Sequence, residues 1–469
     1  TTMLRLRRYL NPYMFMFMVS VILLFIQANL DLALPDYLSQ IVNTGIQQSG
    51  VETPVAVAMR QETFDHLLLF LSDEDATAVQ DAYTLVQPGT VEAGEYVGQY
   101  PYLASQAIVV RNELSDDEIE ALTTPMAEAL LAVTALQQAM TDPEAAAQMG
   151  GDGGAFDLSR LPAGTDLFAL IGRLPAAQRA EISETMNERF AALGETMVAQ
   201  TAVVTVKAEY EALGMDVVGL QNSYILRVGA IMLGITLLSA VATVTVGYLS
   251  AKIAAAIGRD LRSDVFRKVE SFSSAEFDKF PTASLITRST NDITQLQMVT
   301  MFMVRLVFYA PIMGIGGTIR AIGKGSSMWW TIAVAVIVLV GVIGVVISIA
   351  MPRFQVVQKL IDRINLVARE NLSGMMVIRA FNMQRFEEKR FDKANQDLTD
   401  NTLFIARVTS VMMPVMMFIL NVLSVVIIWV GARQVADANM QVGDVMAFLQ
   451  YAMQIVFSFL MLSMLFIIL

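Results

Sequence analysis

The sequence predicts an all-α membrane protein, built from six long transmembrane helices and a mainly helical domain outside the membrane. Hydrophobic residues make up 55% of the chain and charged residues only 16%, and the mean hydropathy of +0.53 is far from that of a soluble globular protein. Four charge-free runs are each long enough to cross a hydrocarbon core of about 30 Å at about 1.5 Å per residue. These runs are residues 228–251, 325–352, 408–432 and 445–469.

Two further spans carry weaker signals. Residues 13–26 are apolar apart from one serine but short, and residues 293–319 are interrupted by Arg305. The first run follows three arginines within residues 5–8, as in a secretory signal, but no small-x-small cleavage site comes after it, so we interpret it as a retained span. An intramembrane arginine is tolerated where it faces a bundle interior or a watery cavity. The sequence therefore predicts six spans.

The positive charges predict the orientation of these spans. Besides the N-terminal arginines, residues 252–292 hold seven Lys/Arg and residues 353–407 hold ten. Cytoplasmic loops are enriched in Lys and Arg, which places these regions and both chain ends inside. The segment 45–222 then lies outside, where its 27 Asp/Glu against 7 Lys/Arg describe a solvated acidic domain. This charge itself says nothing about nucleic acid, and we expect no nucleic-acid partner.

Helix signals dominate the acidic segment. Ser115 and Glu118 form a capping-box pattern, Pro175 suits a first helical turn, and Gly214 suits the end of a helix. Residues 107–111 favour one short strand. The glycine-rich run 150–154 lacks the Lys and Ser/Thr of a phosphate-binding loop, so we interpret it as a flexible connection.

Cysteine and histidine usage excludes several kinds of site. The chain has no Cys, which excludes disulfides and Cys-based zinc sites. Its single histidine, His66, precedes three leucines, a pattern typical of a partly buried helix residue rather than a metal ligand. We expect no metal site.

Several spans continue as helices beyond the membrane. From residue 225 the helical apolar stripe runs on to Phe272, about 48 residues and about 70 Å, more than twice the bilayer core. Similar stripes follow span four, over 354–368, and precede span five, over 386–403. We expect two long hairpins that act as levers and reach a partner.

Two sequence motifs at the ends of these hairpins resemble motifs of a known family. Residues 262–266 (Arg-Ser-Asp-Val-Phe), the Phe277-Asp278 pair and residues 285–292 (Leu-Ile-Thr-Arg-Ser-Thr-Asn-Asp) resemble the first intracellular loop of ATP-binding-cassette (ABC) exporters. Residues 370–374 (Glu-Asn-Leu-Ser-Gly) and 377–382 (Val-Ile-Arg-Ala-Phe-Asn) resemble the second. The likeness covers everything except residues 45–222, and some bacterial members carry an extracytoplasmic insert there. It implies a multi-pass protein of a bacterial plasma membrane.

The resemblance implies an organisation for the whole chain. It comprises an amphipathic inner-surface element (1–12), span one (13–44), the outer insert (45–222), span two with its extension (223–272), a first coupling loop (273–284), span three (285–324), span four with its extension (325–370), a second coupling loop (371–383), span five (384–438) and span six (441–469).

What the resemblance implies for mechanism is a dimer of such halves, a heterodimer or else a homodimer, around an inner cavity. Short coupling helices near 275–283 and 372–380 would dock on ATPase domains, and ATP binding would swing the levers. The residues implied in coupling are Phe277, Asp278, Leu285, Arg288, Asn291, Asp292, Asn371, Leu372, Gly374, Val377, Ile378, Ala380 and Phe381.

The ATPase itself has no motif in this sequence. No Gly-x-x-x-x-Gly-Lys-Ser/Thr occurs, and residues 372–375 lack the second Gly of the family's ATPase signature. ATP and Mg are therefore implied for an ATPase domain beyond these residues. Because the sequence begins at Thr1 and stops inside a span, we expect that domain to follow Leu469, with a separate ATPase chain as the alternative.

Polar and methionine-rich positions in the spans are the candidates for a substrate cavity. Methionine suits surfaces that accept varied hydrophobic ligands, although packing against lipid or a neighbouring helix is the alternative. Gln450 and Gln454 share one helix face and would line a cavity or bond a neighbouring helix, and Arg305 would line it, snorkel or form an ion pair. The candidates are Met301, Arg305, Met413, Met417, Gln450 and Gln454.

The expected function is ATP-driven export of hydrophobic or amphipathic compounds, as in multidrug exporters. Lipid flipping and peptide export within the same family are alternatives. A rival from another class is a non-transporting receptor or scaffold, whose acidic outer domain binds a ligand while the levers signal.

Overall fold

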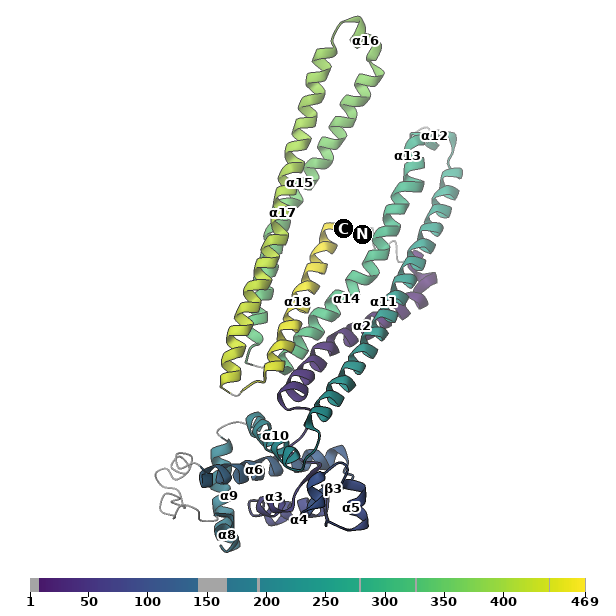
Figure 1. Cartoon of the computed structure of the whole chain (residues 1–469). Helices are drawn as coiled ribbons and strands as arrows, with labels where there is room; N and C mark the ends of the chain where they lie inside the picture. Colours follow the sequence, from purple (N-terminus) through teal and green to yellow (C-terminus); the bar gives the residue numbers. More distant parts are fainter. Residues whose placement is uncertain are drawn as a thin grey trace. The chain divides into compact units, whose positions relative to one another are not determined.

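The computed structural model describes residues 8–141, 167–191, 195–277, 280–324, 327–437 and 439–468. They fold into two compact units, one of residues 1–33, 236–430 and 448–469, the other of residues 34–235 and 431–447. Long helices dominate the chain, and this confirms the predicted all-α class (Figure 1).

Six helices match the predicted spans in position. They are α2 (Met14–Gln40), α11 (Val217–Glu270), α14 (Ile293–Lys324), α15 (Trp329–Ser373), α17 (Gln384–Ala436) and α18 (Val442–Ile468). Each is long and apolar enough to cross a membrane. The helix of span two is 54 residues long, because it begins at Val217 rather than at 225.

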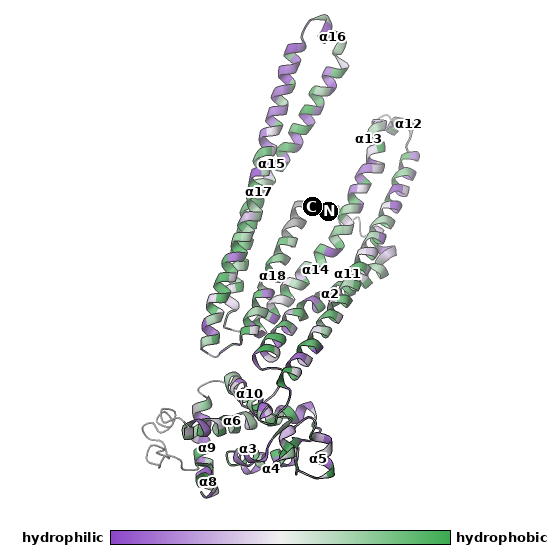
Figure 2. Cartoon of the chain, viewed as in Figure 1, coloured by the Kyte–Doolittle hydropathy of each residue, from purple (hydrophilic) through white to green (hydrophobic). Residues whose placement is uncertain are grey.

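The predicted hairpins are present. In the first, α11 and α14 are joined by α12 (Ser274–Phe277), α13 (Thr282–Thr287) and a π-helical turn, η5 (Arg288–Asp292). In the second, α15 and α17 are joined by α16 (Met375–Ala380). Hydrophobic residues dominate α15 and α17 away from α16, and hydrophilic ones dominate near it (Figure 2).

Polar contacts hold the second hairpin in register. Arg390 Nη2 lies 2.6 Å from Glu370 Oε2, next to the tip. Farther along, Arg353 Nη1 donates to Asn401 Oδ1 at 3.0 Å, and its guanidinium lies 4.7 Å from the ring centre of Phe404. Each exposed ion pair contributes little to stability, but contacts repeated along two helices fix which residues face each other.

The N-terminal segment lies against the extension of α11. The hydroxyl of Tyr13, in the 3₁₀ turn η1 (Asn11–Tyr13), donates to Asp260 Oδ2 at 2.7 Å, and Tyr9 donates to Asp264 Oδ2 at 2.9 Å. The Tyr13 hydrogen bond lowers the pKa of Asp260. Of the predicted inner-surface element at 1–12, residues 1–7 lie outside the described part of the chain.

The second unit contains a small antiparallel sheet among helices. Its strands have the order β1-β3-β2, and Val109 of β3 pairs with Met59 on one side and Leu85 on the other. Only β3 was predicted from sequence. The elements are β1 (Ala58–Arg60), α3 (Gln61–Leu68), α4 (Asp73–Ala82), β2 (Tyr83–Val86), α5 (Val91–Tyr96), η3 (Pro101–Ala104), β3 (Ile108–Arg111), α6 (Asp116–Thr141), α8 (Leu167–Gly172), α9 (Ala176–Ala191) and α10 (Glu195–Ala212).

Helix α6 is the centre of this domain's core. By length and composition it is a seventh candidate span, but Met126 and Leu130 are fully buried and half of its most apolar window lies inside the protein. It packs along α10, where the Thr134 and Thr205 hydroxyls lie 2.8 Å apart. We therefore assign it to the core and not to the membrane.

The local predictions for this domain are confirmed. Glu118 N–H donates to Ser115 Oγ at 3.4 Å while Ser115 N–H donates to Glu118 Oε2 at 2.7 Å, and this capping box lowers the pKa of Glu118. Gly214 follows α10 with φ +78°. His66 is partly buried in α3 and stacks on Phe168, with 3.8 Å between ring centres. The run 150–154 lies outside the described residues.

Asn43 anchors the π-helical turn η2 (Ile41–Gln47), which continues α2, to the start of α18. Its Oδ1 accepts the Gly443 N–H at 2.7 Å and its Nδ2 donates to Ser39 Oγ at 3.1 Å. Replacing Asn43 by Ala leaves the buried Gly443 N–H unpaired, so we expect a loss of about 1–3 kcal/mol. Thermal unfolding in detergent measures it. Asn29→Ala, which removes a bond only to its own helix, is the control; equal destabilisation by both variants would contradict the anchoring role.

Candidate functional site

The first hairpin tip begins with one half of a capping box. Ser273 N–H and Oγ donate to Glu276 Oε2 at 2.9 and 3.0 Å, and these bonds lower the pKa of Glu276. One coupling helix was expected over 275–283, but α12 covers only Ser274–Phe277 and α13 starts at Thr282. Pro281, with ψ 133°, begins the second helix and cannot continue the first.

The predicted coupling residues of this tip are spread over three turns. Phe277 is 41% exposed at the end of α12, and Leu285 is half-buried in α13. Arg288, Asn291 and Asp292 are exposed on η5, a π-helical turn of the kind that often marks functional sites. Asp278 lies outside the described residues.

The second tip presents apolar side chains to solvent. Leu372, Met376 and Phe381 are 74%, 83% and 75% exposed. Asn382 takes φ +53° and turns the chain, while Met383 N–H donates to Ile378 O at 2.9 Å. Of the other predicted coupling residues, Val377 and Ala380 are exposed, and Asn371, Gly374 and Ile378 are half-buried.

Gly374 permits the tight turn into α16. A Cβ at this position would lie 3.0 Å from Glu370 O, closer than side chains normally approach a backbone oxygen. The exposed apolar cluster beyond it, on an otherwise charged hairpin, is the kind of patch that marks a protein interaction site.

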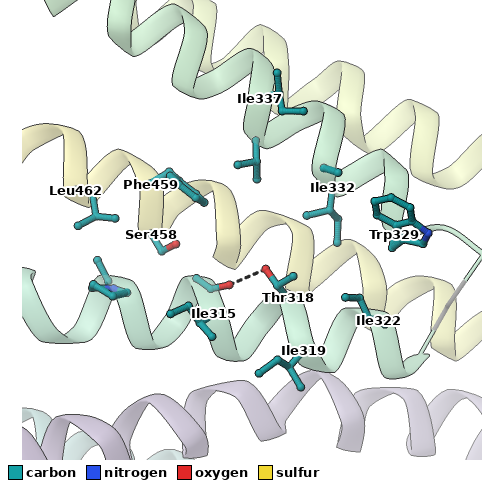
Figure 3. A pocket seen from close by; sticks show the side chains of 15 residues that line it. Ile315, Thr318, Ile319, Ile322, Trp329, Ile332, Ile337, Ser458, Phe459 and Leu462 are labelled. Carbon is teal, nitrogen blue, oxygen red and sulfur yellow. Dashed lines mark hydrogen bonds between the residues drawn. The ribbon is translucent and has the colours of Figure 1, made fainter.

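Within the spans, α14, α15 and α18 line an open pocket of about 640 Å³ (Figure 3). Its two hydroxyls are engaged with backbone: Thr318 donates to Gly314 O and Ser458 to Ile455 O, both at 2.7 Å. The pocket therefore favours an apolar occupant. Its lining residues are Ala310, Pro311, Gly314, Ile315, Thr318, Ile319, Ile322, Trp329, Ile332, Ala333, Val336, Ile337, Ser458, Phe459 and Leu462.

None of the six cavity residues predicted from sequence lines this pocket, and they lie on α14, α17 and α18. Met301 and Arg305 are exposed on α14, and the Arg305 guanidinium lies 6.0 Å from the ring centre of Tyr309. Met413 and Met417 are exposed on α17. Gln450 and Gln454 are half-buried on α18.

A polar cluster around Asp31 in α2 was missed by sequence reasoning. The Asp31 carboxylate accepts from Ser239 Oγ of α11 at 2.6 Å, from Tyr309 OH of α14 at 2.7 Å and from Gln27 Nε2 at 3.5 Å. Gln454 Nε2 of α18 lies 3.4 Å from the Asp31 carbonyl oxygen. Four spans thus meet at Asp31, three of them at its carboxylate, and Gln454 is the predicted residue that the structure brings there.

This cluster lies near the middle of the charge-free part of α11. On α11, Ser239 stands between Arg227 and Lys252, about 18 Å from one and about 20 Å from the other along the helix. A carboxylate near the centre of a span costs about 2.5–3.5 kcal/mol to insert and usually marks function. Span one was expected over 13–44 and so included Asp31, but the sequence does not show which residues of the other spans face this carboxylate.

Long helices that are apolar enough to cross a membrane, joined in hairpins with exposed apolar tips, define a multi-span membrane protein. The comparison with protein families identifies it: residues 199–459, more than half of the chain, match the ABC transporter transmembrane region, and the chain belongs to this family. The matched range contains both hairpins and every lining residue of the pocket except Leu462. Asp31 and most of the second unit, which the sequence predicts to lie outside and which we call the outer domain, precede it.

Curated relatives match about half of the chain. An uncharacterized ABC transporter ATP-binding protein of Mycobacterium tuberculosis is 38% identical over 240 residues, 51% of this chain and 41% of the relative. Another, from Bacillus subtilis, is 32% identical over 227 residues, 48% of this chain and 40% of the relative. The ATP-dependent lipid A-core flippase of Hahella chejuensis is 24% identical over 231 residues, 48% of this chain and 39% of the flippase. The chain thus spans about two fifths of these relatives.

Proposed function

We propose that this chain is the transmembrane half of an ATP-driven exporter that moves hydrophobic or amphipathic compounds out of the cytoplasm or the inner leaflet. The observation that carries the proposal is the continuity of α15. Trp329, Ile332 and Ile337 line the pocket at one end of this helix, and the exposed apolar tip follows Ser373 at its other end. From Ile337 to Ser373 is about 54 Å of unbroken helix. A displacement of the tip therefore reaches the pocket wall.

The motor in this proposal is a pair of ATPase domains that bind ATP and Mg, fused to this chain or separate. They would grip the tips of α12 and α16, in a dimer with a second transmembrane half, most simply a heterodimer. ATP favours the outward-facing state only if that state binds ATP more tightly than the inward-facing state does. The docked tips would couple this difference in ATP affinity to the spans. The names of the relatives, which are ATP-binding proteins, support such a partner.

Lipid flipping is the second candidate, favoured by the function named for the Hahella chejuensis relative. A flippase is expected to present basic groups to lipid headgroups at the mouth of its cavity. The pocket lined by α14, α15 and α18 has no charged residue among its described lining, and Arg305 does not line it. Its chemistry thus supports apolar compounds over headgroup recognition.

Filling the pocket should block substrate binding. Ala333, half-buried on α15, lines the pocket, so Ala333→Trp places an indole inside it. With the full-length transporter and its partner half in proteoliposomes, we expect the concentration of a neutral lipophilic dye that half-stimulates ATP hydrolysis to rise at least tenfold, while basal hydrolysis stays unchanged. Val345→Trp, on the exposed side of the same helix, is the matched control. Equal responses of the two variants would reject this pocket as the substrate site.

A further inference from the structure

We propose that Asp31 binds the positive charge of an amphipathic cation whose apolar body occupies the pocket between α14, α15 and α18. This inference rests on the export function proposed above and names the class of substrate. Four observations on the described residues carry it: unpaired acceptors, the absence of a cationic partner, the nearby pocket and the spare capacity of the carboxylate.

Two amide oxygens beside Asp31 have no hydrogen-bond partner. Gln27 is only 4% exposed, and its Nε2 faces the carboxylate, so its Oε1 is left unpaired. Gln454 likewise turns its Nε2 to the Asp31 carbonyl oxygen and leaves Oε1 unpaired and buried. Rotating the Gln27 amide would set oxygen against carboxylate, which is repulsive. In each glutamine the unpaired Oε1 belongs to the same amide group as the Nε2 that bonds Asp31. Both unpaired oxygens therefore lie close to Asp31.

The groups that bond the Asp31 carboxylate are all neutral. Ser239, Tyr309 and Gln27 supply one donor each, whereas an ionised carboxylate has about four acceptor positions. In the described part of the chain no basic side chain forms an ion pair with Asp31, and Arg305 lies over the ring of Tyr309 instead. The cluster is thus rich in acceptors and short of a positive charge, which a bound cation supplies.

The apolar pocket lies one helical turn from this cluster. Gln454 and Ser458 are four residues apart on one face of α18, about 6 Å along the helix, and Ser458 lines the pocket. On α14, Tyr309 directly precedes the lining residues Ala310 and Pro311. A small inorganic ion would need only the oxygens. An apolar cavity of about 640 Å³ next to them fits an organic cation.

Two ions of matched shape and opposite charge test the proposal. Binding of tetraphenylphosphonium and tetraphenylborate is measured by equilibrium dialysis on the full-length transporter with its partner half in lipid nanodiscs. Asp31→Asn should weaken tetraphenylphosphonium binding at least tenfold and leave tetraphenylborate binding unchanged or tighter. Gln27→Leu keeps the Asp31 carboxylate, so it should weaken tetraphenylphosphonium binding by less than Asp31→Asn does and leave tetraphenylborate binding unchanged. Asp36→Asn, on the same helix outside the cluster, should change neither.

Three results would overturn the proposal. They are wild-type cation affinity in Asp31→Asn, an equal loss of both ions in that variant, and displacement of tetraphenylphosphonium by sodium ions that depends on Asp31, which would indicate an inorganic cation site. Export of the neutral dye by the same preparation tests the export function separately from the cation assignment. If the wild-type protein exports the dye but Asp31→Asn keeps its cation affinity, only the cation assignment fails. If the wild-type protein exports neither compound, the export function fails.

Discussion

Replacing Phe381 by Ala should uncouple ATP hydrolysis from transport without unfolding the spans. Phe381 is 75% exposed at the end of α16, so truncation removes little that the chain itself buries. An exposed aromatic that fills a partner's groove is typical of an interface hot spot, where truncation costs about 2 kcal/mol or more, or about 30-fold in affinity. We expect substrate-stimulated ATP hydrolysis to lose most of its response and transport per ATP to fall, with unchanged thermal stability.

Phe15→Ala is the matched control for this variant. Phe15 is 81% exposed near the start of α2, on a span rather than at a hairpin tip. It removes the same side chain without touching the proposed docking surface, so coupling should stay at the wild-type level. Unchanged stimulation in Phe381→Ala, or the same loss in both variants, would count against docking through α16.

The hairpins were predictable because the helical pattern does not stop at the membrane. The stripe that runs on to Phe272 predicted the extension of α11, which continues as helix to Glu270. The pattern of residues 354–368 likewise predicted the extension of α15. An apolar repeat of 3.6 residues can be read from the sequence alone, so a helix can be predicted without knowing what it packs against.

The sheet of the outer domain was only partly predictable. Its strands have three or four residues each, too few for an alternating pattern to be distinguished from helix. Their pairing with one another and their packing against α3, α4 and α10 determine their conformation instead.

The candidate cavity was harder to predict than the helices. Composition identifies Met413 and Gln450 as unusual residues in a span, but not which way each helix is rotated about its axis. In the structure Met413 is exposed, while isoleucines such as Ile332, unremarkable in sequence, line the pocket. Asp31 was missed for the same reason: it lies within the predicted span one, but the sequence does not show that residues of three other helices bond to it.

Replacing Glu209 by Ala should destabilise the outer domain by about 3 kcal/mol. Glu209 is 5% exposed and accepts hydrogen bonds from Arg60 Nη2 at 2.6 Å, Arg60 Nε at 3.0 Å and Thr63 Oγ1 at 2.9 Å. Breaking a buried pair by removing one partner costs about 3–5 kcal/mol, and the lower end applies here because the Arg60 side chain stays 30% exposed. Hydrogen exchange of α10 and β1 in the full-length protein measures the loss.

Glu211→Ala is the control for the outer domain. Glu211 lies two residues after Glu209 on the same helix, but its side chain is 60% exposed. Its ion pair with Lys207, four residues before it, is long at 3.9 Å. Such a surface pair contributes about 0.3–0.5 kcal/mol. Equal exchange in the two variants would show that the Arg60 pair does not hold α10 to the sheet.

Glu209→Ala also distinguishes the exporter hypothesis from the receptor hypothesis. In the exporter the pocket, α15 and the exposed tips belong to the unit formed by residues 1–33, 236–430 and 448–469, and none of them needs the core around Glu209. Export and stimulated ATP hydrolysis should therefore persist in Glu209→Ala at a temperature where the outer domain has lost its protection. A receptor that reads ligands through that domain would instead lose its response together with the fold, and it would show no substrate-stimulated ATP turnover before or after the change.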